Sequence, residues 1–341
     1  MRTAIAMSGG VDSSVAALLL RDAGHDVLGL VMSLGHGGDE IDDARRVADD
    51  LGIGLEVVPL AGDFEESVVD YFTGEYAAGR TPNPCVVCNP LIKFGRLLDE
   101  ARRLGADALA TGHYARVSET RDGRSLLRGV DTSKDQSYFL YRLTQSQLAR
   151  AVMPVGDLTK VEVRERARAA GLHVSDRRGS ADACFVPGGD LEAFLRKRVP
   201  RAATPGPILD GDGRVVGEHR GVGLYTIGQR TGLGLSRPRP TYVVAIDVGR
   251  GAILVGDEDD LLRDHLAAAR LSWVAGRPPA PSFGARAKIR STGEPAVCRV
   301  EVVGDVAAVH FDRPQRAVAP GQSVVFYDGE YVLGGGVIRS E

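Results

Sequence analysis

The chain has 341 residues, a formal net charge of −3 and four cysteines. A chain of this length exceeds one compact core, so we expect two or three domains. The lack of a basic excess excludes a protein that holds nucleic acid by overall charge, although local basic patches would be enough. We find no signal peptide and no transmembrane run, and therefore expect a cytoplasmic protein with reduced thiols and no membrane partner.

The N-terminal stretch predicts a buried strand over 3–7, a glycine-rich turn over 8–13 and a helix over 14–20. Glycines let the backbone approach an anion, and the N–H groups at a helix start point towards it. Ser8 and Ser13 add hydroxyl donors, and Asp12 is a candidate ligand for Mg²⁺. The lysine of a Walker A motif is missing, so the turn is not an ordinary P-loop. The alternative is a plain strand-to-helix turn with glycines for tightness.

Strands and helices then alternate along the chain. Apolar runs predict strands at 27–32, 55–58 and 108–110, and helical spacing predicts helices at 41–51, 64–78 and 97–104. This order predicts a doubly wound parallel sheet, in which ligands bind beyond the carboxyl ends of the strands. The glycine-rich turn, Met32 and Gly112 with His113 should therefore share one edge of the sheet. Met32 would pack on an adenine ring there, or simply fill the core.

A C-x-x-C pair, Cys85 and Cys88, follows two prolines spaced by one residue. The prolines predict a stiff, non-helical loop over 81–89. The pair alone fits half a zinc site, a redox dithiol or ligands of an iron–sulfur cluster. Neither a second C-x-x-C nor an H-x-x-x-H motif follows, so nearby residues do not complete a structural zinc site.

The second half of the chain changes character. A hairpin is expected over 118–130, and a helix over 159–170 carries three arginines that we interpret as a solvated face. From about residue 205 the strands shorten and Asp-Gly turns recur. Five strands after residue 264 predict an antiparallel β-barrel, and Cys298 within one of them is expected to be a buried core thiol.

These motifs together resemble the bacterial tRNA-specific 2-thiouridylase family over essentially the whole chain. The turn S-G-G-x-D-S resembles the pyrophosphate-binding loop of the ATP-pyrophosphatase (PP-loop) group. The matching stretches are 8–15, 81–89, 92–94, 110–116, 134–140, 183–185, 225–235 and 320–322. The resemblance implies an α/β PP-loop (HUP-like) domain over 1–200, a small central domain over 201–263 and a C-terminal β-barrel for tRNA over 264–341.

The family's reaction implies ATP and Mg²⁺ as cofactors and tRNA as substrate. ATP would adenylate the C2 oxygen of the wobble uridine, with loss of pyrophosphate. A persulfide on Cys184 would replace the oxygen, and Cys88 would release the sulfur and leave a Cys88–Cys184 disulfide. By resemblance, ATP would be bound by Ala6, Met7, Ser8, Gly9, Gly10, Val11, Asp12, Ser13, Met32 and Gly112. The target base would be contacted by Asn83, Pro84 and Cys85. The tRNA would be contacted by His113, Lys134, Asp135, Gln136, Gln322, Arg290 and Ser291.

Cys85 departs from the family, which commonly has an aspartate there to help activate the base. Three thiols, Cys85, Cys88 and Cys184, could ligate a 4Fe–4S cluster with one open iron that presents hydrosulfide. Otherwise Cys85 is a spare thiol or half of a C-x-x-C that resolves the disulfide. A cysteine desulfurase, a sulfur carrier or sulfide would donate sulfur to a monomeric enzyme. Another PP-loop synthetase and a non-catalytic RNA-binding protein remain alternative functions.

Overall fold

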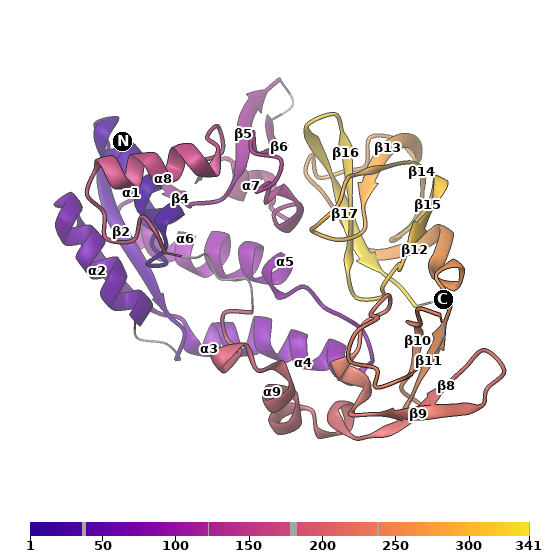
Figure 1. Ribbon diagram of the computed structural model, residues 1–341. Coiled ribbons are helices and arrows are strands. Elements are labelled where there is room, and N and C mark those ends of the chain that lie inside the picture. Colours follow the sequence, from indigo (N-terminus) through magenta and orange to yellow (C-terminus); the bar gives the residue numbers. More distant parts are fainter. Residues whose placement is uncertain (36–38, 122, 178–182, 237–238, 341) are drawn as a thin grey trace.

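The computed structural model describes residues 1–35, 39–121, 123–177, 183–236 and 239–340. The chain forms an N-terminal α/β domain, a small central β domain and a C-terminal barrel, in that order (Figure 1). This architecture confirms the predicted fold class. Within the described ranges, no helix is both long enough and apolar enough to cross a membrane.

The N-terminal domain is built on a five-stranded parallel sheet with the strand order β3-β2-β1-β4-β7. Its strands are β1 (Arg2–Ala6), β2 (Asp26–Ser33), β3 (Gly54–Pro59), β4 (Ala108–Ala110) and β7 (Ala151–Val152). From β1 the chain continues on one side to β2 and returns later on the other side as β4. A doubly wound sheet has its ligand crevice at such a switch point, so the turn after β1 and the end of β4 are placed to form one.

Helices cover both faces of this sheet because neighbouring residues of a strand point to opposite faces. Ile5 packs with α1 (Val11–Asp22), α2 (Asp39–Leu51) and α8 (Lys160–Ala169). Ala4 points to the other face, which is covered by two helical runs. The first run comprises α3 (Ala61–Phe64), the π-helix η1 (Glu65–Val69) and α4 (Asp70–Ala77), and the second comprises α5 (Pro84–Cys88), the π-helix η2 (Asn89–Leu97) and α6 (Leu98–Arg103).

The second run corrects the prediction of a non-helical loop over 81–89. Cys85 and Cys88 lie one turn apart on α5. Proline is compatible with a helix at its first position, where Pro84 stands, and the Asn83 side chain accepts a hydrogen bond from the Cys85 N–H at 3.1 Å. The helical run continues past Pro90, and the Gln147 amide donates to the carbonyls of Pro90 and Phe94.

The central domain contains a four-stranded sheet with the order β10-β11-β8-β9. Its strands are β8 (Gly206–Leu209), β9 (Val215–His219), β10 (Tyr242–Asp247) and β11 (Ala252–Gly256). Short helices connect the sheets: η3 (Ser137–Phe139), α7 (Gln145–Leu148), η4 (Pro187–Gly189), α9 (Leu191–Arg198), η5 (Pro200–Ala203), η6 (Val222–Leu224) and η7 (Asp259–Leu261).

Six antiparallel strands form the C-terminal barrel, which closes through pairing of its first strand with its last. They are β12 (Leu262–Trp273), β13 (Ser282–Lys288), β14 (Ala296–Val303), β15 (Val306–Arg316), β16 (Ser323–Asp328) and β17 (Tyr331–Ile338). The five strands named from sequence correspond to β13–β17. The sequence analysis missed β12, whose alternation is broken by several alanines and arginines.

The hairpin β5 (Ala115–Thr120) and β6 (Gly123–Arg128) extends the barrel sheet although it belongs to the N-terminal domain. Leu127 pairs with Tyr331 of β17. Beside this seam, the buried hydroxyls of Tyr138 and Tyr141 reach Ser323, at 2.7 Å to its carbonyl and 3.3 Å to its hydroxyl. The N-terminal domain and the barrel therefore share a sheet edge and a buried interface.

A buried ion pair supports this interface. The Asp135 carboxylate has no exposed surface and accepts hydrogen bonds from the Arg128 guanidinium at 3.0 Å and from the N–H groups of Gly129 and Ser137. The buried Lys288 ammonium of β13 lies within electrostatic range of both charges, and burial lowers its pKa. Asp135 therefore holds two cations that would otherwise be buried without a counter-charge.

We predict that Asp135→Ala destabilises the fold by about 3–5 kcal/mol, because Arg128 and two backbone N–H groups lose their buried acceptor. Asp157→Ala is the matched control, since Asp157 is 76% exposed and 3.8 Å from Arg116; it should cost less than about 1 kcal/mol. Thermal and urea unfolding of the two variants measure the difference. Equal stability of both variants would contradict a supporting role for the buried pair.

Candidate active site

The turn after β1 has the backbone that its sequence requires. Gly9 adopts a positive φ of 65°, and a Cβ there would lie 2.9 Å from both the Asp43 Cβ and the Glu40 carbonyl oxygen of α2. The Ser13 hydroxyl donates to the Gly10 carbonyl at 3.0 Å and accepts from the Ser8 N–H at 3.2 Å. Gly10 is the N-cap of α1 and has no side chain to occupy the first N–H groups of that helix. An anion can bind these groups.

Gly112 brings the end of β4 against this turn. An ideal Cβ on Gly112 would lie 2.6 Å from the Ser13 nitrogen and 2.7 Å from the Asp12 carbonyl carbon. Only a glycine permits this close approach. Met32 is the penultimate residue of β2, at the same sheet edge, and is half-buried against the hydrophobic core. Gly112 thus lies against the turn, and Met32 lies at the same edge of the sheet.

Asp12 is held by two residues that the sequence analysis did not name. The Lys160 ammonium lies 2.6 and 2.7 Å from its two carboxylate oxygens, and the Tyr114 hydroxyl donates to Oδ1 at 2.7 Å. Burial, followed by the contact with Asp12, raises the pKa of Tyr114. Lys160 is far from Asp12 in sequence, and only the packing of α8 against α1 brings the pair together.

Three thiols form a second cluster. Cys85 and Cys184 are exposed and Cys88 is buried. The pKa of Cys88 is raised to about 12, mainly by burial and to a smaller extent by the thiols of Cys85 and Cys184, while the Lys93 ammonium opposes the shift. Burial and Cys85 likewise raise the pKa of Cys184. The fold therefore brings together thiols that are far apart in sequence.

Aromatic packing anchors Cys184 through its neighbour. The buried Phe185 ring makes edge contacts with Phe64, Phe72 and Phe194 at centroid distances of 5.6, 5.0 and 5.6 Å. The preceding residues 180–182 of the predicted loop lie outside the described part of the chain. Cys298 is distant from this cluster: it lies in the barrel core, where its thiol contacts the Ala285 carbonyl and burial raises its pKa to about 12.

The thiol cluster and the phosphate turn are neighbours. Glu40 raises the pKa of Cys184, and the backbone of the same residue lies against Gly9. Lys93 acts electrostatically on Cys88 and also on His113, which follows Gly112. A substrate bound beside the turn would therefore lie near the thiols.

The three thiols do not have the arrangement of a metal site. In the described ranges, no group of three or more His, Cys, Asp or Glu side chains is placed to hold a metal ion. Cys85, Cys88 and Cys184 all fall within those ranges. As arranged here they do not fit a cluster, and we derive no chemistry through one.

The residues proposed to contact tRNA differ in exposure. Lys134 is exposed. His113 is buried, its Nδ1 lies 2.7 Å from the Thr111 hydroxyl, and burial holds its pKa well below 6.5, so it is a neutral strand-end histidine. The Gln136 side chain accepts from the Tyr114 N–H at 2.9 Å. The Asp135 carboxylate is buried as well. The side chains of Asp135 and Gln136 therefore hold the turn on which the exposed Lys134 lies.

The remaining tRNA candidates lie on the barrel side. The Gln322 amide donates to the Thr81 carbonyl at 2.7 Å, and the Thr81 N–H donates to the Pro320 carbonyl at 3.0 Å. Arg290 is half-buried and donates to the Ala317 carbonyl at 3.1 Å, and Ser291 beside it is half-buried. The Gln322 side chain thus fixes the segment at Thr81 that leads into α5, the helix that carries Cys85 and Cys88.

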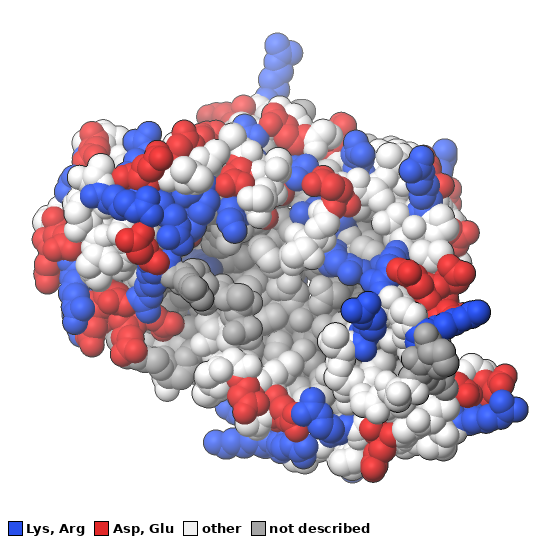
Figure 2. Space-filling model, viewed as in Figure 1, with Lys and Arg blue, Asp and Glu red and all other residues white. Residues whose placement is uncertain are grey.

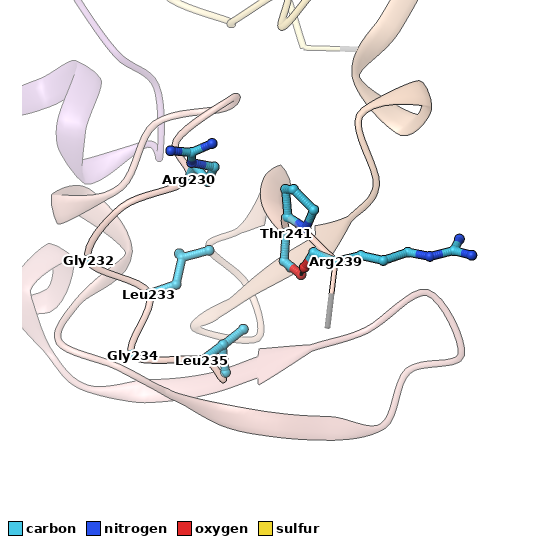
Figure 3. A pocket seen from close by; sticks show the side chains of 8 residues that line it. Arg230, Gly232, Leu233, Gly234, Leu235, Arg239 and Thr241 are labelled. Atoms are coloured by element: carbon cyan, nitrogen blue, oxygen red, sulfur yellow. Dashed lines mark hydrogen bonds between the residues drawn. The ribbon is translucent and has the colours of Figure 1, made fainter. Parts of the chain in front are cut away.

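Two surface features add to this description. In Figure 2, Lys and Arg side chains gather on both flanks of the hollow between the N-terminal domain and the barrel side of the molecule. A separate hollow of about 400 Å³ lies in the central domain. Figure 3 shows Leu233 and Leu235 beside it, with Arg230 and Arg239 pointing in different directions. None of the residues lining this second hollow belongs to the turn or the thiol cluster.

Comparison with known proteins assigns these domains. Family models match a tRNA methyl transferase HUP domain over residues 1–188, a tRNA methyl transferase PRC-barrel domain over 192–257 and an aminomethyltransferase β-barrel domain over 263–338. A tRNA-specific 2-thiouridylase MnmA from Roseiflexus sp. is 48% identical over 99% of both chains. Proteins of the same name from Magnetococcus marinus (46% identical, 99% and 98% covered) and Chloroflexus aurantiacus (49% identical, 98% and 97% covered) are similarly related.

We predict that Gly112→Ala weakens ATP binding about 10- to 100-fold, because the added methyl group must displace the first turn of α1. Overpacking of this kind costs about 1–3 kcal/mol. Gly74→Ala is the control, since a Cβ at this position in α4 meets no neighbouring atom within 4 Å. Calorimetric titration with ATP measures both variants. Wild-type affinity in Gly112→Ala would refute the close approach.

We also predict that brief iodoacetamide treatment at pH 8 labels exposed Cys85 well before Cys88. A thiol with a pKa of about 12 is only about one part in ten thousand ionised at that pH, and the thiolate is the reactive form. Labelling of Cys88 should rise with pH, because its thiolate fraction grows until the pH reaches that pKa. Cys298 serves as the internal control, and peptide mass spectrometry gives the rates. Equal rates at Cys85 and Cys88 would contradict the pKa shift.

Proposed function

Because the chain belongs to the tRNA-specific 2-thiouridylase family, we propose that it places sulfur at C2 of the wobble uridine of tRNA. It is an ATP-using tRNA sulfurtransferase of the PP-loop group. The observation that carries the proposed mechanism is the proximity of the phosphate turn to a cluster of three thiols. Glu40 lies against Gly9 of the turn and acts electrostatically on Cys184, and Lys93 acts on Cys88 and on His113, which follows Gly112. Activation by ATP and attack by sulfur then occur at adjacent places.

The first step is adenylation. The C2 oxygen of the uridine attacks the α-phosphorus of ATP, a P–O bond forms, and the bond to pyrophosphate breaks. The turn at 8–13 and the first N–H groups of α1 bind the phosphates. Asp12 is the candidate residue for Mg²⁺, which when bound neutralises phosphate charge. Adenylation thus converts the C2 oxygen from a poor leaving group into a good one, because the oxygen can now depart as part of AMP.

The second step transfers sulfur. The outer sulfur of a Cys184 persulfide attacks C2, and AMP leaves with the former uridine oxygen. The Cys88 thiolate next attacks the Cys184 sulfur, so a Cys88–Cys184 disulfide forms and the base keeps its sulfur as 2-thiouridine. A dithiol reductant supplies two electrons to reset the disulfide, and a donor protein that carries a persulfide then transfers its outer sulfur to the Cys184 thiolate, leaving the donor's own thiol behind. Alternatively, sulfide attacks the Cys184 sulfur of the Cys88–Cys184 disulfide, which forms the Cys184 persulfide directly and releases the Cys88 thiolate.

Cys88 must lose its proton for this step, although burial favours the thiol. Lys93 is half-buried and its charge lowers the pKa of Cys88, so it is the group suited to stabilise the thiolate. Cys85 stands one turn earlier on α5, where an aspartate is common in the family. A thiol there can attack the disulfide, form a C-x-x-C disulfide with Cys88 and free Cys184 for the next sulfur.

For tRNA binding, we propose that the central domain, the barrel and Lys134 surround the anticodon region. The basic flanks of the hollow in Figure 2 support this orientation. A net charge of −3 gives no attraction by itself, so binding should depend on these local patches. The start of α5 is formed by Asn83, Pro84 and Cys85. These residues belong to or lie beside the thiol cluster and are suited to contact the target base.

We predict that Cys184→Ser and Cys88→Ser each abolish 2-thiouridine formation, because each removes one sulfur atom that the transfer requires. Cys298→Ser is the matched control and should retain activity. Nucleoside mass spectrometry of treated tRNA measures the product, and pyrophosphate release that depends on added tRNA should persist in the cysteine variants. Release without tRNA would favour another PP-loop synthetase, and the absence of release would favour a non-catalytic RNA-binding protein.

The cluster alternative is tested in the same preparations under anaerobic conditions. The persulfide route predicts colourless, iron-free, active protein that accumulates the Cys88–Cys184 disulfide during turnover. Brown protein with broad absorption near ~400 nm, as expected of thiolate-bound iron–sulfur centres, would overturn that route if Cys85→Ser abolished both the colour and the activity.

A further inference from the structure

The phosphate turn lacks the lysine of a Walker A motif, yet a lysine lies beside it. Lys160 begins α8, and its ammonium contacts both carboxylate oxygens of Asp12 within the turn. We propose that Lys160 is the cation of this phosphate site and that it binds the β- and γ-phosphates of ATP. The inference rests on the adenylation proposed above and adds to it a residue that contacts the departing pyrophosphate.

The position of Lys160 is fixed by its surroundings. Thr159 and Glu162 form a capping box at the start of α8, and the Lys160 N–H donates to Asp131 at 2.9 Å. The apolar side of α8 packs into the same core cluster as α1 through Val163 and Ala167. The lysine is therefore held by a rigid element and does not reach the turn from a free loop.

The charge around the turn needs such a cation. The Asp43 side chain packs against Gly9 through its Cβ, and Asp12 lies within the stretch 8–13 itself. Arg177 donates to the Gly9 carbonyl at 3.2 Å but is already paired with Asp43. Lys160 is 18% exposed and Asp12 32% exposed, so both can be reached by a ligand.

Nucleotide binding would exchange the partners of this pair. A phosphate chain brings several negative charges beside the Asp12 carboxylate, and Mg²⁺ is the natural partner for that carboxylate. The Lys160 ammonium is then released to phosphate oxygens, where charge-assisted hydrogen bonds are strongest. Its charge is most useful as pyrophosphate leaves, because negative charge on the leaving group grows during that step.

The test compares Lys160→Gln, Lys160→Arg and the control Lys197→Gln, which alters an exposed lysine of α9. Calorimetry with Mg²⁺ measures the affinities for ATP and for AMP in the absence of tRNA. Loss of a charge-assisted contact should weaken ATP binding about 10- to 100-fold in Lys160→Gln. AMP binding should stay unchanged, because AMP lacks the two phosphates in question. Lys160→Arg should restore part of the ATP affinity, and Lys197→Gln should match wild type.

Each other outcome is decisive. Equal loss of ATP and AMP affinity, or unchanged ATP affinity, in a Lys160→Gln protein with a native circular dichroism spectrum would overturn the role of Lys160. Lys160 would then be only a structural partner of Asp12. Wild-type protein that binds ATP but releases no pyrophosphate with tRNA would instead refute the proposed adenylation. The comparison of ATP affinity with AMP affinity in the Lys160 variants would still test whether Lys160 contacts the β- and γ-phosphates.

Discussion

The hydrogen bonds between residue 81 and the turn at 320–322 determine where the cysteine-bearing helix begins. The Thr81 backbone is bound on both sides by this turn, and its hydroxyl reaches Thr226 of the central domain at 3.3 Å. Gly321 has a φ of 90°, and a Cβ there would lie 2.8 Å from the Arg80 Cβ, so the two segments pack without a side chain between them. All three domains therefore meet just before Cys85.

An ion network reinforces this junction. The carboxylate of Glu75 is 5% exposed and pairs with Arg80 at 2.6 Å and with Arg270 of β12 at 3.2 Å. Burial opposes its charge, but hydrogen bonds from the two guanidinium groups leave the pKa of Glu75 below its usual value. Separating the barrel from the N-terminal domain would remove Arg270 from this buried carboxylate, which would then pair with Arg80 alone. The chemistry of the thiols thus depends on contacts made by residues far from them in sequence.

The sequence analysis correctly predicted the doubly wound sheet, the barrel and the family, because each leaves a local or ordered pattern in the chain. Period-two and helical spacings reveal strands and helices, and the turn at 8–13 has its own signature. The non-helical loop over 81–89 was wrong because proline at the first helical position is compatible with a helix, so two prolines did not decide the matter. The three arginines of α8 are also not equivalent: Arg164 is half-buried and donates to the carbonyls of Ser175 and Arg177.

The sequence could not show which residues that are far apart in the chain lie close together in the fold. Nothing local to residue 160 indicates that its side chain meets Asp12, since the two are joined only by helix packing. Burial is equally hidden: Asp135 looks like an exposed polar residue in the chain, but it lies inside the fold. The roles assigned to individual site residues remain proposals, and the structure adds to them the surroundings on which each role depends.

The shared edge between β6 and β17 has a consequence for biosynthesis. Tyr138 and Tyr141 are made early, but Ser323, their hydrogen-bonding partner, and β17, which pairs with β6, are synthesised more than 180 residues later. Until then the nascent N-terminal domain has an open strand edge and an uncovered aromatic surface. Such species associate with one another unless they are protected, so chaperones are expected to hold this domain until β17 has been synthesised and has paired with β6.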